Sequence, residues 1–169
     1  MKPAFTPGEA WRIVSHFTAD PLPPDWRDQL AQRLGRRPRR VGLWTELAMY
    51  GARRCLDEAG ESALPAGARL RVSSTRGAWG ATHAALAQLD GGVLMPFTFM
   101  QSQPALMLAE VGRCLEWQGD ASFALCRDAQ QLLRLSAVGA GRSGLLIGVV
   151  EEERNGDKPR SEWWRLVPA

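Results

Sequence analysis

The residues best suited to covalent or metal chemistry are few. The chain of 169 residues contains three cysteines, Cys55, Cys114 and Cys126, and two histidines, His16 and His83. The cysteine count is odd, no Cys-x-x-Cys pair occurs and the histidines are not clustered, so neither a disulfide framework nor a zinc site is indicated. We therefore expect reduced thiols in a cytoplasmic protein, with no bound metal and no cofactor.

Cys126 is the thiol whose position best suits a nucleophile. It follows an apolar segment and lies just ahead of a helix predicted over 129–135 with Asp128 as its N-cap. The N-terminal partial charge of that helix would lower the pKa of a nearby thiol. The alternative interpretation is a small buried side chain at the end of a strand. We interpret His16 and His83 as structural or surface residues. No Gly-x-Ser-x-Gly elbow of a serine hydrolase occurs.

The basic charge of the chain is concentrated in one segment. The formal net charge is +3, and four arginines, Arg36, Arg37, Arg39 and Arg40, stand almost side by side. The tryptophans are not interleaved with arginines, so this pattern does not predict nucleic-acid binding. The segment is either a solvated loop or a docking site for an acidic protein.

Hydrophobic periodicity predicts alternating strands and helices. The predicted strands cover 11–17, 69–74, 121–126, 144–150 and 161–167, and the predicted helices cover 26–34, 44–59, 81–89 and 129–135, with one more between 102 and 119. This alternation is typical of a three-layer α/β/α domain, and 45% hydrophobic residues suffice for a single domain over 1–169. No run of 18 apolar residues predicts a membrane span.

Two local patterns concern the C-terminal strands. Asn155-Gly156 predicts a turn, so the last two strands should form an antiparallel pair that closes the sheet. Because side chains alternate along a strand, Trp163 and Trp164 cannot both face one core, and we expect one of them to be exposed or to cover a partner.

Several segments resemble, in their order, the β-ketoacyl synthase and chain-length-factor family. They are RRVGLWTELA (39–48), CLDEAG (55–60), VSSTRG (72–77), FMQS (99–102), WQG (117–119) and LLIGVVEE (145–152). The resemblance extends over residues 9–167, but it corresponds only to the N-terminal half of the duplicated thiolase-like fold. It implies a mixed five-stranded sheet of order 3-2-1-4-5 with the last strand antiparallel.

The resemblance also implies partners. In this family the strand before the nucleophile pairs with a dimer mate across a two-fold axis, which places Ser122, Phe123, Ala124 and Leu125 at the seam of a homodimer or of a heterodimer with a ketosynthase-type subunit. The four arginines would then be candidates for docking an acyl carrier protein.

This sequence does not match the family at its catalytic residues. Its nucleophilic cysteine lies nine residues beyond the glycine of a Gly-Pro step, and nine residues beyond Gly119 the chain has Asp128, with Cys126 two residues short. The family's two catalytic histidines come from a C-terminal half that has no counterpart here, and His16 and His83 match neither.

We therefore expect a non-catalytic ketosynthase-like subunit, akin to a chain length factor, in fatty-acid, polyketide or aryl-polyene-type biosynthesis. One alternative is a minimal acyltransferase or thioesterase-like enzyme acylated on Cys126. Another is a module that binds acyl carrier protein without chemistry.

Overall fold

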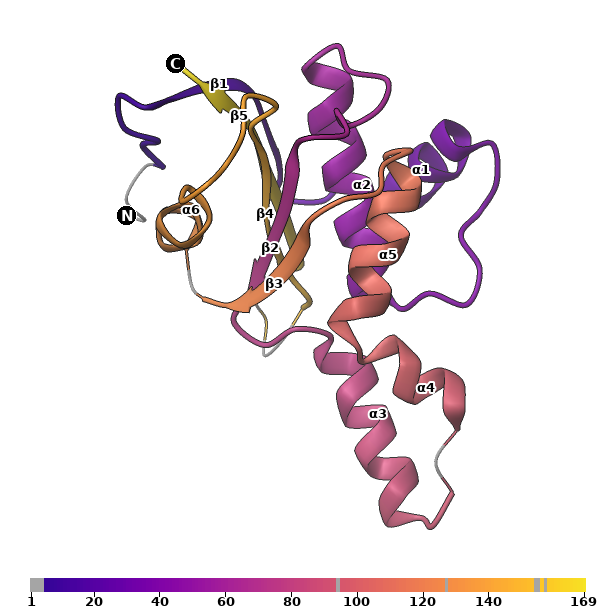
Figure 1. The fold of residues 1–169 in the computed structure, drawn as a ribbon. Helices are drawn as coiled ribbons and strands as arrows, with labels where there is room; N and C mark the ends of the chain where they lie inside the picture. The colour runs from indigo at the N-terminus through magenta and orange to yellow at the C-terminus, as the bar shows by residue number, and fades with distance from the viewer. Residues whose placement is uncertain (1–4, 94, 127, 154–155, 157) are drawn as a thin grey trace.

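A mixed five-stranded sheet forms the centre of the computed structural model, which describes residues 5–93, 95–126, 128–153, 156 and 158–169 (Figure 1). In chain order the elements are β1 (Trp11–Ala19), α1 (Trp26–Leu34), α2 (Leu43–Glu58), β2 (Arg69–Ser74), α3 (Trp79–Asp90), α4 (Pro96–Gln101), α5 (Pro104–Cys114), β3 (Ala121–Leu125), α6 (Ala129–Ser136), β4 (Leu145–Glu151) and β5 (Arg160–Pro168). The predicted strands and long helices are confirmed, with ends shifted by a few residues.

The predicted strand order is wrong. Across the sheet the order is β1-β5-β4-β2-β3, so the first strand lies at an edge and not at the centre. After the irregularity between Ile13 and Ser15, β1 is exposed at His16 and Thr18 and buried at Ser15 and Phe17, which suits a strand covered mainly on one face. β5 is antiparallel to both β1 and β4, as expected, but the β4–β5 pair does not close the sheet because β1 lies outside it.

Helices cover both faces of the sheet, which confirms the mixed three-layer α/β arrangement. β4 is buried almost throughout: Leu146 and Val150 belong to the core beneath α2 and α5, while Ile147 and Val149 belong to the core beneath α6. An apolar strand with both faces covered is the natural centre of such a sheet. This double coverage explains why β4, and not β1, occupies the middle.

The adjacent tryptophans belong to two different cores, as alternation predicts, but neither of them is exposed. Trp163 is 0% exposed in the core of α2, and Trp164 is 4% exposed on the opposite face. Trp164 is covered by Phe5, at 4.7 Å between ring centroids, and by the stacked ring of His16 at 5.0 Å. Because the sheet has a core on each side, alternation buries both indoles.

Trp163 lies in a slot formed by two glycines. A Cβ atom on Gly148, its partner on β4, would come within 2.6 Å of three ring carbons, and one on Gly51 of α2 would come within 2.4 Å of the indole. The indole nitrogen donates to Ser161 Oγ at 2.9 Å, and that hydroxyl donates to Leu47 O at 2.7 Å. Small residues on both sides therefore let α2 approach β5 closely.

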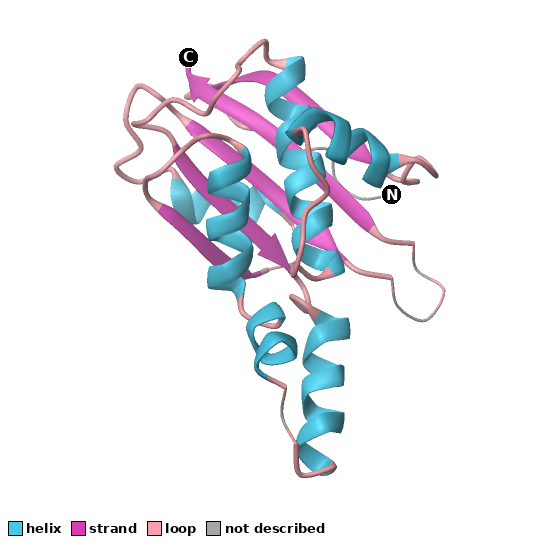
Figure 2. Cartoon of the chain, turned by 90° about the vertical axis from the view of Figure 1, so that its right-hand side faces the viewer, coloured by secondary structure: helices cyan, strands magenta, loops and turns pink. Residues whose placement is uncertain are grey.

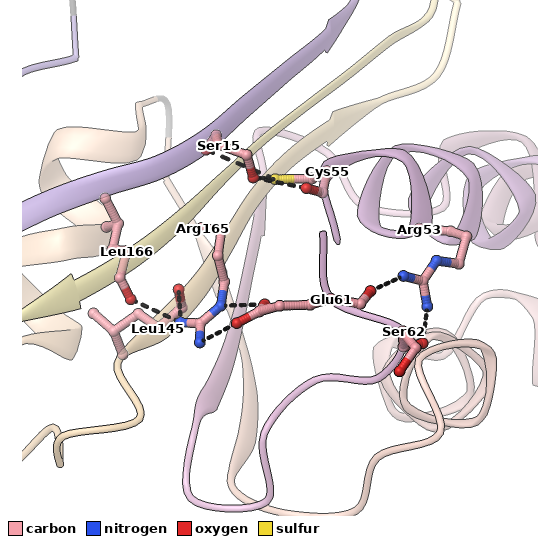
Figure 3. A network of polar contacts seen from close by, with 8 residues as sticks. All are labelled: Ser15, Arg53, Cys55, Glu61, Ser62, Leu145, Arg165 and Leu166. Atoms are coloured by element: carbon pink, nitrogen blue, oxygen red, sulfur yellow. Dashed lines mark hydrogen bonds and ion pairs between the residues drawn. The ribbon is translucent and has the colours of Figure 1, made fainter. Parts of the chain in front are cut away.

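A polar network joins the end of α2 to the C-terminal strands (Figure 3). Glu61 accepts two hydrogen bonds from the buried guanidinium of Arg165, at 2.7 and 3.0 Å, and its main-chain carbonyl accepts from Arg53 at 2.6 Å. Ser15 of β1 donates to the carbonyl of Cys55 at 2.7 Å. These contacts hold α2 against β1 and β5.

Helices α3 and α4 extend away from the sheet as a helical hairpin (Figure 2). α4 forms within an apolar, proline-punctuated segment for which the sequence predicted no regular element, and Pro96 occupies its first turn, where a missing N–H is tolerated. Asn155 of the predicted turn lies outside the described residues. Among the described residues, every helix is too short or too polar to cross a membrane.

Gly148→Ala should lower the free energy of unfolding by about 1–3 kcal/mol, because the added methyl group overpacks the Trp163 slot. Chemical denaturation followed by tryptophan fluorescence measures this. Gly141→Ala is the matched control, since its Cβ would meet no atom within 4 Å, and it should change stability by less than about 0.5 kcal/mol. Equal effects of the two substitutions would contradict the packing described.

Candidate functional site

The carboxyl ends of the three parallel strands meet at one edge of the sheet, named here the carboxyl edge. β2 is parallel to both β3 and β4, so Thr75, Cys126 and Glu151 follow or end neighbouring strands on the same side. This is the usual location of sites in open α/β sheets. A pocket of about 330 Å³ lies there, lined by Thr75, Arg76, Leu125 and Cys126.

Cys126 is placed in this pocket but has no catalytic partner among the described residues. The residue is 6% exposed, and its sulfur lies 3.7 Å from the carbonyl of Asp128. His16 is on β1, where it contacts Glu162 at 3.0 Å, and His83 is on α3 beside Trp79. Neither imidazole lines the described pocket, so the thiol lacks a nearby base.

Asp128 caps helix α6, as the sequence predicted. Its Oδ1 accepts a hydrogen bond from the main-chain N–H of Gln131 at 2.6 Å. The side chain therefore places a carboxylate at the positive end of the helix. The residue that the sequence resemblance aligns with the family's cysteine thus caps a helix in this structure.

Two glutamates that the sequence analysis did not single out occupy the rest of the carboxyl edge. Glu151 accepts from Thr75 N at 2.6 Å, Thr75 Oγ1 at 3.0 Å and Ser74 Oγ at 2.9 Å. Glu152 accepts from Gly80 N at 2.6 Å, in the first turn of α3. Main-chain N–H groups that could stabilise an oxyanion are thus bonded to the chain's own carboxylates. The signal for them was a pair of carboxylates directly after a buried strand.

The other two thiols are unsuited to chemistry. Burial raises the pKa of Cys55 to about 11 and that of Cys114 to about 12. Both remain protonated at neutral pH, where only a thiolate is a strong nucleophile. Within the described residues, nowhere do three histidine, cysteine, aspartate or glutamate side chains gather closely enough to hold a metal ion.

The arginine cluster is divided between two places. Arg36, Arg37 and Arg39 are exposed and line an open groove beside α2 and α5, with a volume of about 810 Å³. Arg40 has a left-handed backbone, with φ 62°, and its guanidinium lies 5.2 Å from the ring centroid of Phe97 on α4. Three of the four arginines therefore share one surface.

The predicted seam lies on an open edge of the sheet. β3 is the outermost strand and pairs with β2 on its other side. Ser122 and Leu125 are exposed, with Leu125 at 71%, while Phe123 and Ala124 are half-buried. The placement at an edge makes the strand available for pairing but does not identify a mate.

The helical hairpin of α3 and α4 carries a second exposed surface, named here the apolar arm. Its large apolar side chains are each about half exposed, and they are Leu86, Leu89, Val93, Met95, Phe97, Phe99 and Met100. A contiguous set of this size exceeds the scattered apolar residues of an ordinary surface.

Two substitutions of Asp128 test its role as the N-cap of α6. Asp128→Ala should lower the free energy of unfolding by about 1 kcal/mol, because the Gln131 N–H loses its acceptor. Asp128→Asn should retain most of the stability, since asparagine caps helices about as well. Thermal and urea denaturation test this, and equal losses in the two variants would show that the cap is not what the residue contributes.

Cys126 should remain unmodified when the folded protein is incubated with an acyl-coenzyme A. The thiol is nearly buried and no described imidazole is available to deprotonate it. Intact-mass spectrometry measures the outcome. Alkylation of all three thiols after unfolding is the control for free cysteines, and an acyl adduct that disappears in Cys126→Ser would support the enzyme alternative.

Comparison with known proteins identifies the fold. No protein-family model matches the sequence, and no curated protein sequence matches it significantly. A solved structure of the ketosynthase ApeO in complex with its chain length factor ApeC, from Xenorhabdus doucetiae, matches with a TM-score of 0.68 and 16% identity over 95% of this chain and 79% of that one.

A second solved structure, the ishigamide ketosynthase/chain length factor, matches with a TM-score of 0.59 and 15% identity. The match covers 98% of this chain but only 46% of that one, so the chain spans less than half its length. At the level of fold, nearly the whole chain resembles part of a ketosynthase or chain length factor.

Proposed function

We propose that this chain is a non-catalytic, chain-length-factor-like subunit that pairs with a ketosynthase-type partner. The observation that carries the proposal is the contrast between two edges of one molecule. At the carboxyl edge the anion-binding groups are already bonded to Glu151 and Glu152, whereas β3 and the apolar arm are uncovered. Such a molecule is suited to binding a protein better than to transforming a substrate.

The exposed edge of β3 supports pairing with another sheet. An outer strand presents unpaired main-chain groups, and proteins usually protect such an edge with charges, prolines or a covering element. β3 has the sequence ASFAL, without a charge or a proline, and Leu125 points into solvent. An unprotected edge of this kind is expected to be covered in an assembly.

The apolar arm provides a second exposed hydrophobic surface. Burial of apolar area contributes roughly 25 cal/mol per Å², so covering several half-exposed leucine, phenylalanine and methionine side chains would stabilise an assembly substantially. A ketosynthase-type mate is favoured over a second copy because the chain itself brings no histidine to the described carboxyl-edge pocket. The mate would supply the chemistry.

Similarity of fold supports the same assignment. One of the matching structures is described as a ketosynthase in complex with its chain length factor. By analogy of fold, we place this chain in fatty-acid, polyketide or aryl-polyene-type biosynthesis as a single ketosynthase-like domain over 1–169. An acyltransferase or thioesterase-like activity on Cys126 is the less favoured alternative, because the described pocket lacks a base.

A second candidate function is docking of an acyl carrier protein. The observation that favours it is the grouping of Arg36, Arg37 and Arg39 on one exposed surface. Arginines arranged in this way attract the carboxylates of an acidic partner and do so less strongly in high salt. This role is compatible with pairing, since none of these arginines belongs to β3 or the apolar arm.

Leu125→Lys should weaken pairing with the ketosynthase by about tenfold or more, because a charge replaces an apolar side chain at the seam. The partner is first identified by purifying the tagged chain from its native host. The dissociation constant is then measured with both proteins purified.

Ile13→Lys is the matched control, because Ile13 is 38% exposed on β1 at the opposite edge of the sheet. We expect a change of less than about twofold in the dissociation constant. Loss of affinity in both variants would contradict a seam at β3. A stable dimer of the chain alone, in light scattering, would favour self-association over a heterodimer.

A further inference from the structure

The groove beside α2 and α5 has a charge pattern that the proposed pairing does not use. Six arginines line it, compared with two glutamates, and they are Arg33, Arg36, Arg37, Arg39, Arg53 and Arg113. They come from three separate places in the chain: the end of α1 with the segment after it, the middle of α2 and the end of α5. The folded chain therefore gathers positive charge that the sequence showed only in part.

One wall of the groove has fewer carboxylates than guanidinium groups. Asp57 pairs with Arg33, at 3.0 Å, and also with Arg53, at 3.0 Å. Arg53 is 3% exposed, and its other two nitrogens donate to the carbonyls of Ser62 and Glu61. Carbonyl groups orient a guanidinium but do not neutralise it, so one carboxylate compensates the buried charge of Arg53 and the exposed charge of Arg33.

The rim of the groove adds charges that have no acidic partner within the described part of the chain. Arg36 and Arg39 are exposed and form no ion pair there, whereas Arg37 pairs with Asp28 and Arg113 pairs with Glu110. Two free guanidinium groups thus face the same volume as the undercompensated wall. Guanidinium groups bind phosphate through paired, charge-assisted hydrogen bonds.

Part of the remaining lining is apolar, beside the polar side chains of Ser62, Glu110 and Glu116. Leu34, Val41 and Met49 contribute to the groove, and its volume of about 810 Å³ is within the range of small-molecule sites. Several guanidinium groups that line one groove are suited to a ligand that carries more than one negative charge. The apolar wall matches an organic group attached to it.

We propose that this groove is a binding site for a small molecule with a diphosphate or with several phosphate groups. The phosphates bind Arg36 and Arg39 at the rim and Arg33 at the wall, the buried charge of Arg53 attracts them without direct contact, and the organic part lies against Leu34 and Val41. The site is separate from β3, the apolar arm and the pocket of Cys126.

Isothermal titration calorimetry with pyrophosphate, ADP and adenosine tests the proposal. We expect pyrophosphate and ADP to bind and adenosine not to bind, with affinities that fall as salt is raised. Tighter binding of ADP than of pyrophosphate means that the apolar wall contacts the nucleoside, and equal binding means that the phosphates suffice. Absence of binding by both phosphate probes at about 1 mM overturns the proposal.

Charge-reversal variants locate the site. Arg36→Glu and Arg39→Glu should each weaken binding of pyrophosphate by about tenfold or more, and both residues are exposed, so the fold should be retained. Arg134→Glu is the matched control, because it makes the same charge change on α6, on the other face of the sheet, and it should alter affinity less than about twofold. Equal weakening in all three variants would reveal a general effect of net charge and overturn the site.

Titration with an acidic acyl carrier protein distinguishes this proposal from the docking alternative. An acidic acyl carrier protein that binds the arginines, while pyrophosphate and ADP do not bind, overturns the small-molecule site and leaves docking as the function of the cluster. Competition of ADP with the carrier protein supports a shared phosphate-binding surface.

Discussion

The buried ion pair between Glu61 and Arg165 is the contact on which the arrangement of the molecule depends. Arg165 is 2% exposed and also donates to the carbonyls of Leu145 and Leu166, so β4 and β5 are joined to the chain just after α2. Removal of the half-buried Glu61 would leave the buried charge of Arg165 unpaired, which typically costs about 3–5 kcal/mol. Since the Glu61 carbonyl also accepts from Arg53, the same residue connects the sheet to the groove wall.

This constraint has consequences at two distant places. On the helical side it holds α2 against the sheet, where Trp163 lies between Gly51 and Gly148, and α2 in turn contributes Arg53 to the lining of the groove. At the sheet it helps to keep β4 central, so that β4 ends beside β2 and delivers Glu151 to the turn after that strand. The packed centre of the sheet therefore positions the carboxyl edge, where Glu151 and Glu152 bind main-chain N–H groups, and also the groove beside α2 and α5.

The distribution of polar contacts explains why a fold similar to that of ketosynthases is proposed to act without catalysis. Asp128, Glu151 and Glu152 accept hydrogen bonds from main-chain N–H groups of α6, of the turn after β2 and of the first turn of α3. N–H groups bonded in this way are not available to stabilise an oxyanion. The proposed lack of catalysis and the local stability of the fold thus rest on the same side chains, while β3 and the apolar arm are exposed.

The sequence by itself determined the class of fold, most strand and helix ranges and the cap at Asp128, because these depend on local periodicity and on the order of segments. It did not determine the place of β1, the burial of both Trp163 and Trp164, or the grouping of Arg33, Arg53 and Arg113 with the arginine cluster. Those depend on which strands become neighbours and on how many faces of the sheet are covered, and such long-range packing is decided only when the whole chain is folded.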